Sequence, residues 1–538
     1  MSKKEKTKKS TEDEVSETKN DSQTQIAHNS KFSQFINFYK NNFVALVCVK
    51  LIALGILIRI FVMKSSLGAI DENESLSLLM GKDVLNGRLS AFRYSHHFSG
   101  TIENLIISPI VGIFGMSGIA TRLVPTIFLV ATSFVLWRAF EHTPYKDTMR
   151  IVMGCLWIWT GYFIYTTTKL TGFSSALIFL EVAALASAYY AAHSLRNLRY
   201  FYLWALVSGL LFWTYSSTLW MLTLPSAYWI LRSSPALKKY KFQAVGLFII
   251  TSLPAIVASG IDKFLPVINT FDKSAGKISN GSTDSFSAFL QLVGIRTFTR
   301  NSVITSFISV PSIIVFGICV IAFVAISSLS IYRITKLKKT DFAQLQILIL
   351  AVTLISTVLF FITSRQVTTS IFICAVIPMI FVCVDKGREN LIKFAVVTFC
   401  LFVIGLFSLT TSTRDFQTNE NQVKQATNAL NKMKVKNAIA PHEFAYPIIV
   451  ESENKITTTP FDGNNFDQKR SGNVHQKIQA IVVDSENKSQ NNLAYCVQGY
   501  FGSAFERTDT GDVFIYSVEK DLQSKIWTVV EKCNDVEK

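Results

Sequence analysis

Long apolar runs separated by short polar loops fill the chain between residues 43 and 411. A helix that crosses a bilayer needs about 20 apolar residues, and by that measure the pattern predicts about eleven spans. The predicted spans are 43–63, 119–139, 151–167, 173–193, 200–216, 218–231, 243–261, 303–331, 343–363, 367–384 and 391–411. The sequence therefore predicts a polytopic α-helical membrane protein.

Basic residues recur in every second loop and give the predicted helices a direction. They are Arg138, Lys146 and Arg150; Arg196 and Arg199; Arg232, Lys238, Lys239 and Lys241; Arg333, Lys336, Lys338 and Lys339; and Lys386, Arg388 and Lys393. Because cytoplasmic loops are enriched in Lys and Arg, this pattern predicts a plasma-membrane protein with a cytoplasmic N-terminus. Loops 64–118 and 262–302, and everything after residue 411, are then predicted outside. Topology accounts for the net charge of +16, so no nucleic-acid partner is expected.

The two ends of the chain differ from the membrane domain, which we assign to residues 42–413. Residues 1–41 are mostly polar and bury too little apolar surface to offset ordering entropy, so we expect a disordered cytoplasmic segment. Residues 414–538 mix short strand-like runs with helical segments, which predicts a small extracytoplasmic α/β domain.

The elements expected in this outer domain can be stated by residue. Helices are predicted at Glu420–Met433 and near Gln468–Ile478, and strands at Val435–Ile439, Pro447–Glu451, Lys455–Thr459, Ala480–Val483 and Val513–Val518. The turn Asp509–Asp512 before the last strand favours a terminal hairpin. Cys496 and Cys533 either pair, as an oxidising compartment allows, or remain two thiols.

The first outer loop, residues 64–118, carries the candidate catalytic chemistry. Loops longer than about a dozen residues are usually functional or disordered, and this one keeps an amphipathic period. Asp71 and Glu72 either cap a helix or supply a carboxylate that takes a proton from an acceptor hydroxyl at the membrane surface. Glu103 either joins the same site or caps a helix beginning at Asn104.

Cations on the predicted outer side are candidates for substrate binding. Lys169 and Arg365 occupy tight turns between spans, where they either contact lipid headgroups or neutralise a phosphate leaving group. The candidate substrate-binding residues are Arg93, Tyr94, His96, His97, Lys169 and Arg365. Adjacent histidines point in different directions, and the Cys residues show no metal-ligand spacing, so no metal or cofactor is predicted. The need for a divalent metal stays open.

Several motifs, taken in order, carry a resemblance to a known family. They are Asp71-Glu72, Gly87, the run Tyr94–Glu103, Pro109, Phe114-Gly115, Arg122-Leu-Val-Pro125, Lys169-Leu-Thr-Gly172-Phe173, Gly209-Leu-Leu-Phe-Trp213 and Pro225. Residues 45–411 thereby resemble the GT-C superfamily of polyprenyl-phosphate-sugar-dependent glycosyltransferases. The resemblance extends to bacterial family-39 proteins, relatives of protein O-mannosyltransferases and lipid A aminoarabinose transferase.

The resemblance implies an inverting transfer on the outer face of the membrane, from a polyprenyl-phosphate-linked sugar to a hydroxyl of a glycan, lipid or protein. It implies an active-site role for Asp71, as general base or acceptor-binding group. We predict that Asp71 is the base, with Glu72 and Glu103 as supporting carboxylates. One alternative is a transporter or flippase of lipid-linked precursors, which predicts paired discontinuous helices and a repeat relating the two halves. Another is a non-catalytic membrane scaffold whose tail binds a partner.

Overall fold

The computed structural model describes residues 42–94, 96–141, 146–194 and 197–261, scattered positions between 348 and 409, and residues 417–461 and 477–536. Within these residues, four helical segments are long and apolar enough to cross a membrane: Phe43–Lys64, Gly118–Ala139, Ser174–His193 and Pro235–Ser259. The chain is therefore an integral multi-pass membrane protein. The predicted segment 1–41, loop 262–302 and helix near 468–478 lie largely or wholly outside the described residues, as do most of the predicted spans after residue 302.

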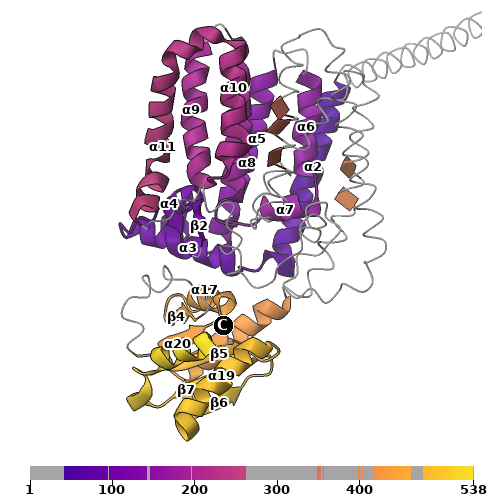
Figure 1. The fold of residues 1–538 in the computed structure, drawn as a ribbon. Helices are drawn as coiled ribbons and strands as arrows, with labels where there is room; N and C mark the ends of the chain where they lie inside the picture. Colours follow the sequence, from indigo (N-terminus) through magenta and orange to yellow (C-terminus); the bar gives the residue numbers. More distant parts are fainter. Residues whose placement is uncertain are drawn as a thin grey trace, which may run out of the picture.

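The described membrane domain is a helical bundle (Figure 1). Its helices are α2 (Phe43–Lys64), α5 (Gly118–Phe140), α6 (Lys146–Trp157), α8 (Ser174–His193), α9 (Asn197–Thr214), α10 (Leu224–Ser233) and α11 (Lys241–Ile261). Helix α8 is central, because 78% of its apolar window is buried, whereas the window that includes most of α11 is 22% buried. The apolar outer face of α11 is thus the kind of surface that lipid covers.

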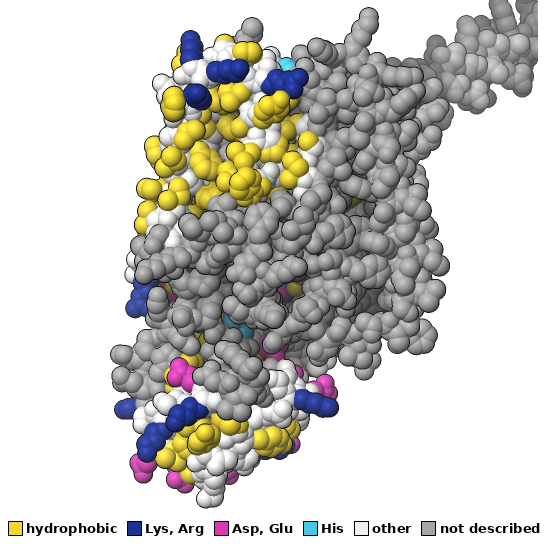
Figure 2. All heavy atoms as spheres, in the orientation of Figure 1, with side chains coloured by type: hydrophobic (Ala, Val, Ile, Leu, Met, Phe, Trp, Pro, Cys, Tyr) yellow, Lys and Arg dark blue, Asp and Glu magenta, His cyan; other side chains and the backbone are white. Residues whose placement is uncertain are grey.

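Apolar and basic side chains occupy different parts of the bundle surface. Figure 2 shows apolar side chains over its outer face and Lys and Arg side chains gathered at one end. That end carries η3 (Pro235–Tyr240), which joins α10 to α11 and holds the exposed Lys238 and Lys239. The first loop, with α3 and α4, lies at the opposite end (Figure 1). This separation is the one that the alternation of basic loops predicts.

The segment predicted as one span over 151–167 is broken. Helix α6 ends at Trp157, and the short helix α7 (Gly161–Thr166) begins after Thr160, whose side chain accepts a hydrogen bond from the Phe163 amide (3.2 Å). A helix end inside a membrane leaves carbonyls that need donors. Arg59 of α2 donates to the Trp157 carbonyl (2.8 Å) and to Thr167 Oγ1 (2.7 Å), so a buried guanidinium bridges the break. Hydropathy alone does not reveal such a break.

The first outer loop is folded. It contains η1 (Ser66–Gly68), α3 (Glu72–Leu85), a hairpin of β1 (Phe92–Arg93) and β2 (His96–Gly100), and α4 (Ile102–Phe114). Trp213, near the end of α9, donates from its indole to the Ala91 carbonyl (2.8 Å). This contact joins the hairpin to the bundle, and the folded loop lies across the end of the bundle (Figure 1).

The C-terminal domain contains one mixed sheet in the order β4-β3-β5-β7-β6. The strands are β3 (Asn437–Ala440), β4 (Thr457–Pro460), β5 (Ala480–Asp484), β6 (Phe505–Asp509) and β7 (Val513–Val518). Strands β4, β3 and β5 are parallel, whereas β6 and β7 form the antiparallel hairpin that the turn at Gly511 predicts. The predicted α/β character of this domain is confirmed.

One predicted strand is wrong: residues Pro447–Glu451 belong to helix α17 (His442–Glu451). The run Ile448-Ile449-Val450 is β-branched, which favours a strand by local propensity. Tertiary burial decides otherwise, because α17 is enclosed on two sides. Ile448 packs in the core of the sheet, while Ile449 and Val450 pack against α3.

Helices cover both faces of the sheet, making three layers. Alternate residues of β3 point to opposite cores, Ala438 and Ala440 toward α17 and helix 417–432, and Ile439 toward α19 (Lys488–Phe501) and α20 (Ile526–Val536). Cys496 of α19 and Cys533 of α20 form a disulfide, which answers the question that the sequence left open.

The C-terminal domain docks on the first loop through α17. Tyr446, Ile449 and Val450 share an apolar cluster with Leu76, Leu79 and other residues of α3, α4 and α5. Tyr446 is 1% exposed. Burial of a large side chain contributes about 1.5–3 kcal/mol, so this contact holds the domain at the end of the bundle that carries the first loop.

Candidate active site

The site begins at the N-terminus of α3. Asp71 precedes the helix with an extended backbone, and its Oδ1 accepts a hydrogen bond from the Glu74 amide (3.0 Å). Glu74 Oε2 in turn accepts from the Asp71 amide (3.5 Å), completing a reciprocal capping box. The capping interpretation of Asp71 is therefore correct, but one carboxylate oxygen is left for other contacts.

Lys169 supplies those contacts from the turn between α7 and α8. Its Nζ lies 2.8 Å from Asp71 Oδ2 and 3.3 Å from Glu74 Oε2, and donates to the Ala69 carbonyl at 2.9 Å. Tyr165, on α7, also donates to Asp71 Oδ2 (3.1 Å). The structure thus brings together two of the sequence-derived candidates, Asp71 and Lys169, which lie far apart in the sequence.

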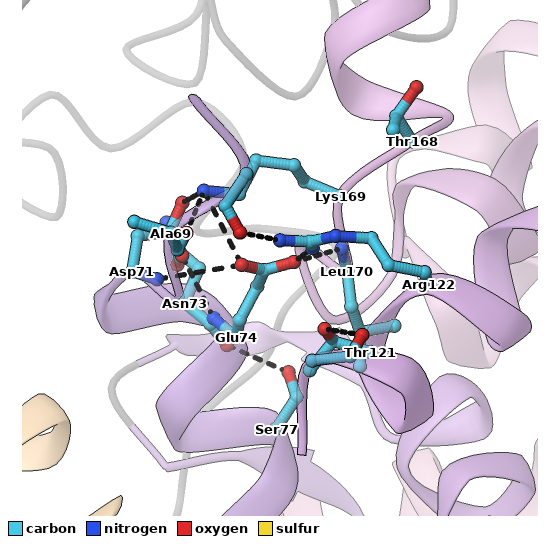
Figure 3. A network of polar contacts seen from close by, with 12 residues as sticks. Ala69, Asp71, Asn73, Glu74, Ser77, Thr121, Arg122, Thr168, Lys169 and Leu170 are labelled. Carbon is cyan, nitrogen blue, oxygen red and sulfur yellow. Dashed lines mark hydrogen bonds and ion pairs between the residues drawn. The ribbon is translucent and has the colours of Figure 1, made fainter. Parts of the chain in front are cut away.

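Glu74 is the hub of the cluster (Figure 3). It is fully buried, contacts Lys169, pairs with Arg122 of α5, and accepts from the Leu170 amide (3.2 Å). Arg122 also donates to the Gly68 carbonyl (2.6 Å), which ties the start of α5 to the end of η1. Three separate segments of the chain therefore meet on one carboxylate.

The cluster of Asp71, Glu74, Arg122 and Lys169 is formally neutral, with two carboxylates and two cations. Burial lowers the pKa of Lys169 to about 8, and the Asp71 carboxylate opposes that shift. Lys169 and Glu74 are 1% and 0% exposed at their side chains, whereas Asp71 is 19% exposed. Asp71 is thus the member that a substrate can reach.

Glu72, the neighbour of Asp71, faces the C-terminal domain. Its Oε1 contacts Nδ1 of His442, the first residue of α17, and the two side chains are 25% and 20% exposed. The His442 ring meets Tyr446 edge-on at 5.0 Å between centroids. The predicted supporting carboxylate therefore joins the two domains beside Asp71.

Arg93 of β1 contacts the first turn of α3. The buried guanidinium donates to the backbone carbonyl and side chain of Asn73 (3.0 and 2.9 Å). Burial lowers the pKa of Arg93, opposed most strongly by the charge of Glu72. Gly172 is required beside it, since its φ is +94° and a Cβ there would meet Arg93 Nε at 2.7 Å. Arg93 thus supports both α3 and the turn that carries Lys169.

Glu103 caps a helix, but a different one from that predicted. Its Oε1 accepts from Ser175 Oγ (2.5 Å) and from the Ala176 amide (2.9 Å), both in the first turn of α8. Burial raises the pKa of Glu103, while the hydrogen bonds from Ser175 and Ala176 oppose the rise. This carboxylate belongs to the joint between α4 and α8, outside the cluster around Asp71.

The remaining predicted site residues are placed as follows. Tyr94 donates from its hydroxyl to Asp83 Oδ2 (3.0 Å), which fastens the hairpin to α3. His96 and His97 contribute their backbone to β2, and Arg365 lies outside the described residues. Among the described residues, no group of three or more His, Cys, Asp or Glu side chains is arranged to hold a metal ion.

Sequence reasoning missed Glu74 and Tyr165 as members of the cluster. Glu74 stands three residues after Asp71, the spacing of a capping box, so the local motif was visible. Its second role, as partner of Arg122 and Lys169, depends on contacts from distant segments. Tyr165 had no local signal, because its contact with Asp71 arises from the break between α6 and α7.

Comparisons with known proteins place this geometry in a known fold. No protein-family model and no curated protein sequence matches the chain. ArnT from Cupriavidus metallidurans bound to undecaprenyl phosphate aligns with a TM-score of 0.50 and 10% identity, covering 86% of this chain and 97% of that chain. ArnT in the apo state aligns with a TM-score of 0.52 and 9% identity, covering 88% and 98%.

The archaeal oligosaccharyltransferase AglB from Archaeoglobus fulgidus, in complex with an inhibitory peptide and a dolichol-phosphate, aligns with a TM-score of 0.45 and 13% identity over 90% of this chain and 75% of that chain. At these identities the ArnT alignments concern the fold alone. The chain shares the fold of ArnT over 86–88% of its length, whereas membership of the GT-C superfamily or of family 39 stays a prediction.

Proposed function

We propose that the chain is a glycosyltransferase that moves a sugar from a polyprenyl-phosphate donor to an acceptor hydroxyl, with inversion at the anomeric carbon. The observation that carries the proposal is the contact between Asp71 Oδ2 and Lys169 Nζ at 2.8 Å. It joins a proton acceptor to a phosphate-binding cation in a fold similar to that of ArnT, which was crystallised with undecaprenyl phosphate.

The chemistry assigns one role to each partner. The acceptor oxygen forms a bond to the anomeric carbon while the bond from that carbon to the phosphate oxygen breaks, and its electron pair leaves with polyprenyl phosphate. Asp71 takes the proton of the attacking hydroxyl as general base. Lys169 stabilises the negative charge that develops on the leaving phosphate.

Other predicted residues take supporting roles in the proposal. Glu72 and Arg93 hold the first turn of α3, on which Asp71 depends, through His442 and Asn73. Glu103 fixes the start of α8 through Ser175. Tyr94, His96, His97 and Arg365 remain candidates for substrate binding on the strength of the sequence pattern.

The proposed reaction takes place on the outer face of the plasma membrane. The basic η3 (Pro235–Tyr240) lies at the end of the bundle opposite the first loop, which supports an outer position for Asp71 under the positive-inside rule. The disulfide between Cys496 and Cys533 supports the same orientation, since such bonds persist in oxidising compartments.

A transfer assay on Asp71→Asn tests the proposal. Asn caps a helix as well as Asp does, so the variant keeps α3 while losing the base. We expect loss of transfer from a labelled polyprenyl-phosphate sugar to membrane acceptors, from a protein that thermal unfolding shows to be folded. Asp147→Asn is the matched control and should keep full activity. Asp147 is a partly exposed carboxylate on α6 that pairs with Arg150. Retention of full activity by Asp71→Asn would remove Asp71 from the mechanism.

A further inference from the structure

Lys169 has no spare donor for a phosphate in the described state. An ammonium group has three N–H donors. Three acceptors surround Nζ: Asp71 Oδ2 at 2.8 Å, the Ala69 carbonyl at 2.9 Å and Glu74 Oε2 at 3.3 Å. A phosphate oxygen that binds this amine must therefore replace one of them.

Asp71 is the partner that can leave. Glu74 is fully buried and is also held by Arg122 and the Leu170 amide. Its removal would take this carboxylate partner away from the buried Arg122, which is costly. The Ala69 carbonyl is fixed by the backbone. The Asp71 side chain is 19% exposed, and after losing Lys169 it keeps the hydrogen bond from Tyr165 (3.1 Å).

Accordingly, we propose that Asp71 and the donor phosphate compete for Lys169, so that donor binding converts Asp71 from an ion-pair partner into the base. The inference rests on the proposed function and adds its regulation. While Lys169 donates to Oδ2, the ammonium group occupies the side of this oxygen that the acceptor hydroxyl would need. Once the phosphate takes the amine, the same oxygen is available to the acceptor hydroxyl.

The competition has a consequence for the order of binding. The acceptor hydroxyl gains its proton acceptor only after the donor is in place, so reaction follows an ordered sequence with the donor first. Beside Glu74, Lys169 has a second anionic partner at each stage: Asp71 before binding and the phosphate afterwards. Because Lys169 is buried, losing Asp71 before the phosphate arrives is unfavourable, which couples the two steps.

Binding of undecaprenyl phosphate to the purified full chain tests the competition. Asp71→Asn removes the competitor's charge and keeps the helix cap, so we expect it to bind undecaprenyl phosphate about tenfold or more tightly than wild type. Asp71→Ser, which also caps helices, should behave the same way. Lys169→Met should bind at least about tenfold more weakly. Asp147→Asn should match wild type.

The outcomes separate this inference from the proposed function. If wild type binds undecaprenyl phosphate and both Asp71 variants, folded by thermal unfolding, bind it equally or more weakly, the competition is excluded while the glycosyltransferase proposal stands. If folded wild type shows no saturable binding of undecaprenyl phosphate, the proposed function itself is overturned. Tighter binding by the Asp71 variants together with weaker binding by Lys169→Met supports the competition.

Discussion

Replacing Glu74 with Gln is the sharpest test of the neutral cluster at the end of the bundle. The substitution keeps the shape of the side chain and an oxygen that accepts from the Leu170 amide, but removes one negative charge. Arg122 and Lys169 then both lose a carboxylate partner, and Lys169 keeps its ion pair with Asp71. Because Lys169 is 1% exposed, water compensates it poorly.

The expected cost follows from the burial of the pair. Removing one partner of a buried ion pair costs about 3–5 kcal/mol, because the remaining charge is left desolvated. We therefore expect Glu74→Gln to lower the free energy of unfolding of the membrane domain by about 3–5 kcal/mol. Asp71→Asn should cost less, about 2 kcal/mol, since Asp71 is partly exposed and the replacement still caps α3.

Equilibrium unfolding in mixed micelles, followed by far-ultraviolet circular dichroism, measures these differences. Glu453→Gln is the matched control, because that side chain is 81% exposed and its partner Lys455 is 72% exposed. The control should lie within about 0.5 kcal/mol of wild type. A Glu74→Gln protein as stable as this control would refute the view that Glu74 holds the cluster together.

Other predictions follow from the pKa of Lys169, the disulfide and the domain contact. Burial lowers the pKa of Lys169 to about 8, and only the protonated amine attracts phosphate, so affinity for undecaprenyl phosphate should fall as pH rises through about 8 in a binding titration. The disulfide closes a 37-residue separation, so replacing both Cys496 and Cys533 with Ser should cost about 4 kcal/mol in chemical unfolding of the C-terminal domain. His442→Ala removes the partner of Glu72 and should speed proteolytic release of that domain at least severalfold, whereas unchanged cleavage would exclude this contact as a fastening.

Local signals in the sequence were enough to select the proposed base and the proposed phosphate-binding cation as candidates. Asp71 stands in a helix-capping context just after an apolar span, and Lys169 in a short turn between two spans. Both signals depend on a few neighbouring residues and on hydropathy, which a single sequence contains. That these residues touch was not visible, because the contact depends on how η1 and the turn after α7 fold back across the bundle.

The predictions that failed concern residues whose structure is decided by contacts from distant segments. The run Ile448-Ile449-Val450 has strand propensity, yet α17 is a helix because it fills the space between the sheet and α3. Glu103 was predicted either to join the site of Asp71 or to cap a helix beginning at Asn104, and instead it caps α8. In each case a distant segment supplies the deciding contact, and no local pattern carries that information.

A neutral cluster is also what the location of the site demands. A single uncompensated cation at the edge of a bilayer would be costly to bury, and a permanently saturated one would be unable to bind phosphate. The arrangement around Lys169 meets both conditions by using two carboxylates of different accessibility: Glu74, buried and fixed, and Asp71, partly exposed and exchangeable. Glu74 stays paired with Lys169 and Arg122, and exchange of Asp71 for a phosphate is the proposed way in which the cluster accepts a charged donor. If Asp71 were fully buried and Glu74 partly exposed, the cluster would keep the same charge. Asp71 could then no longer leave Lys169, and the proposed coupling would be lost.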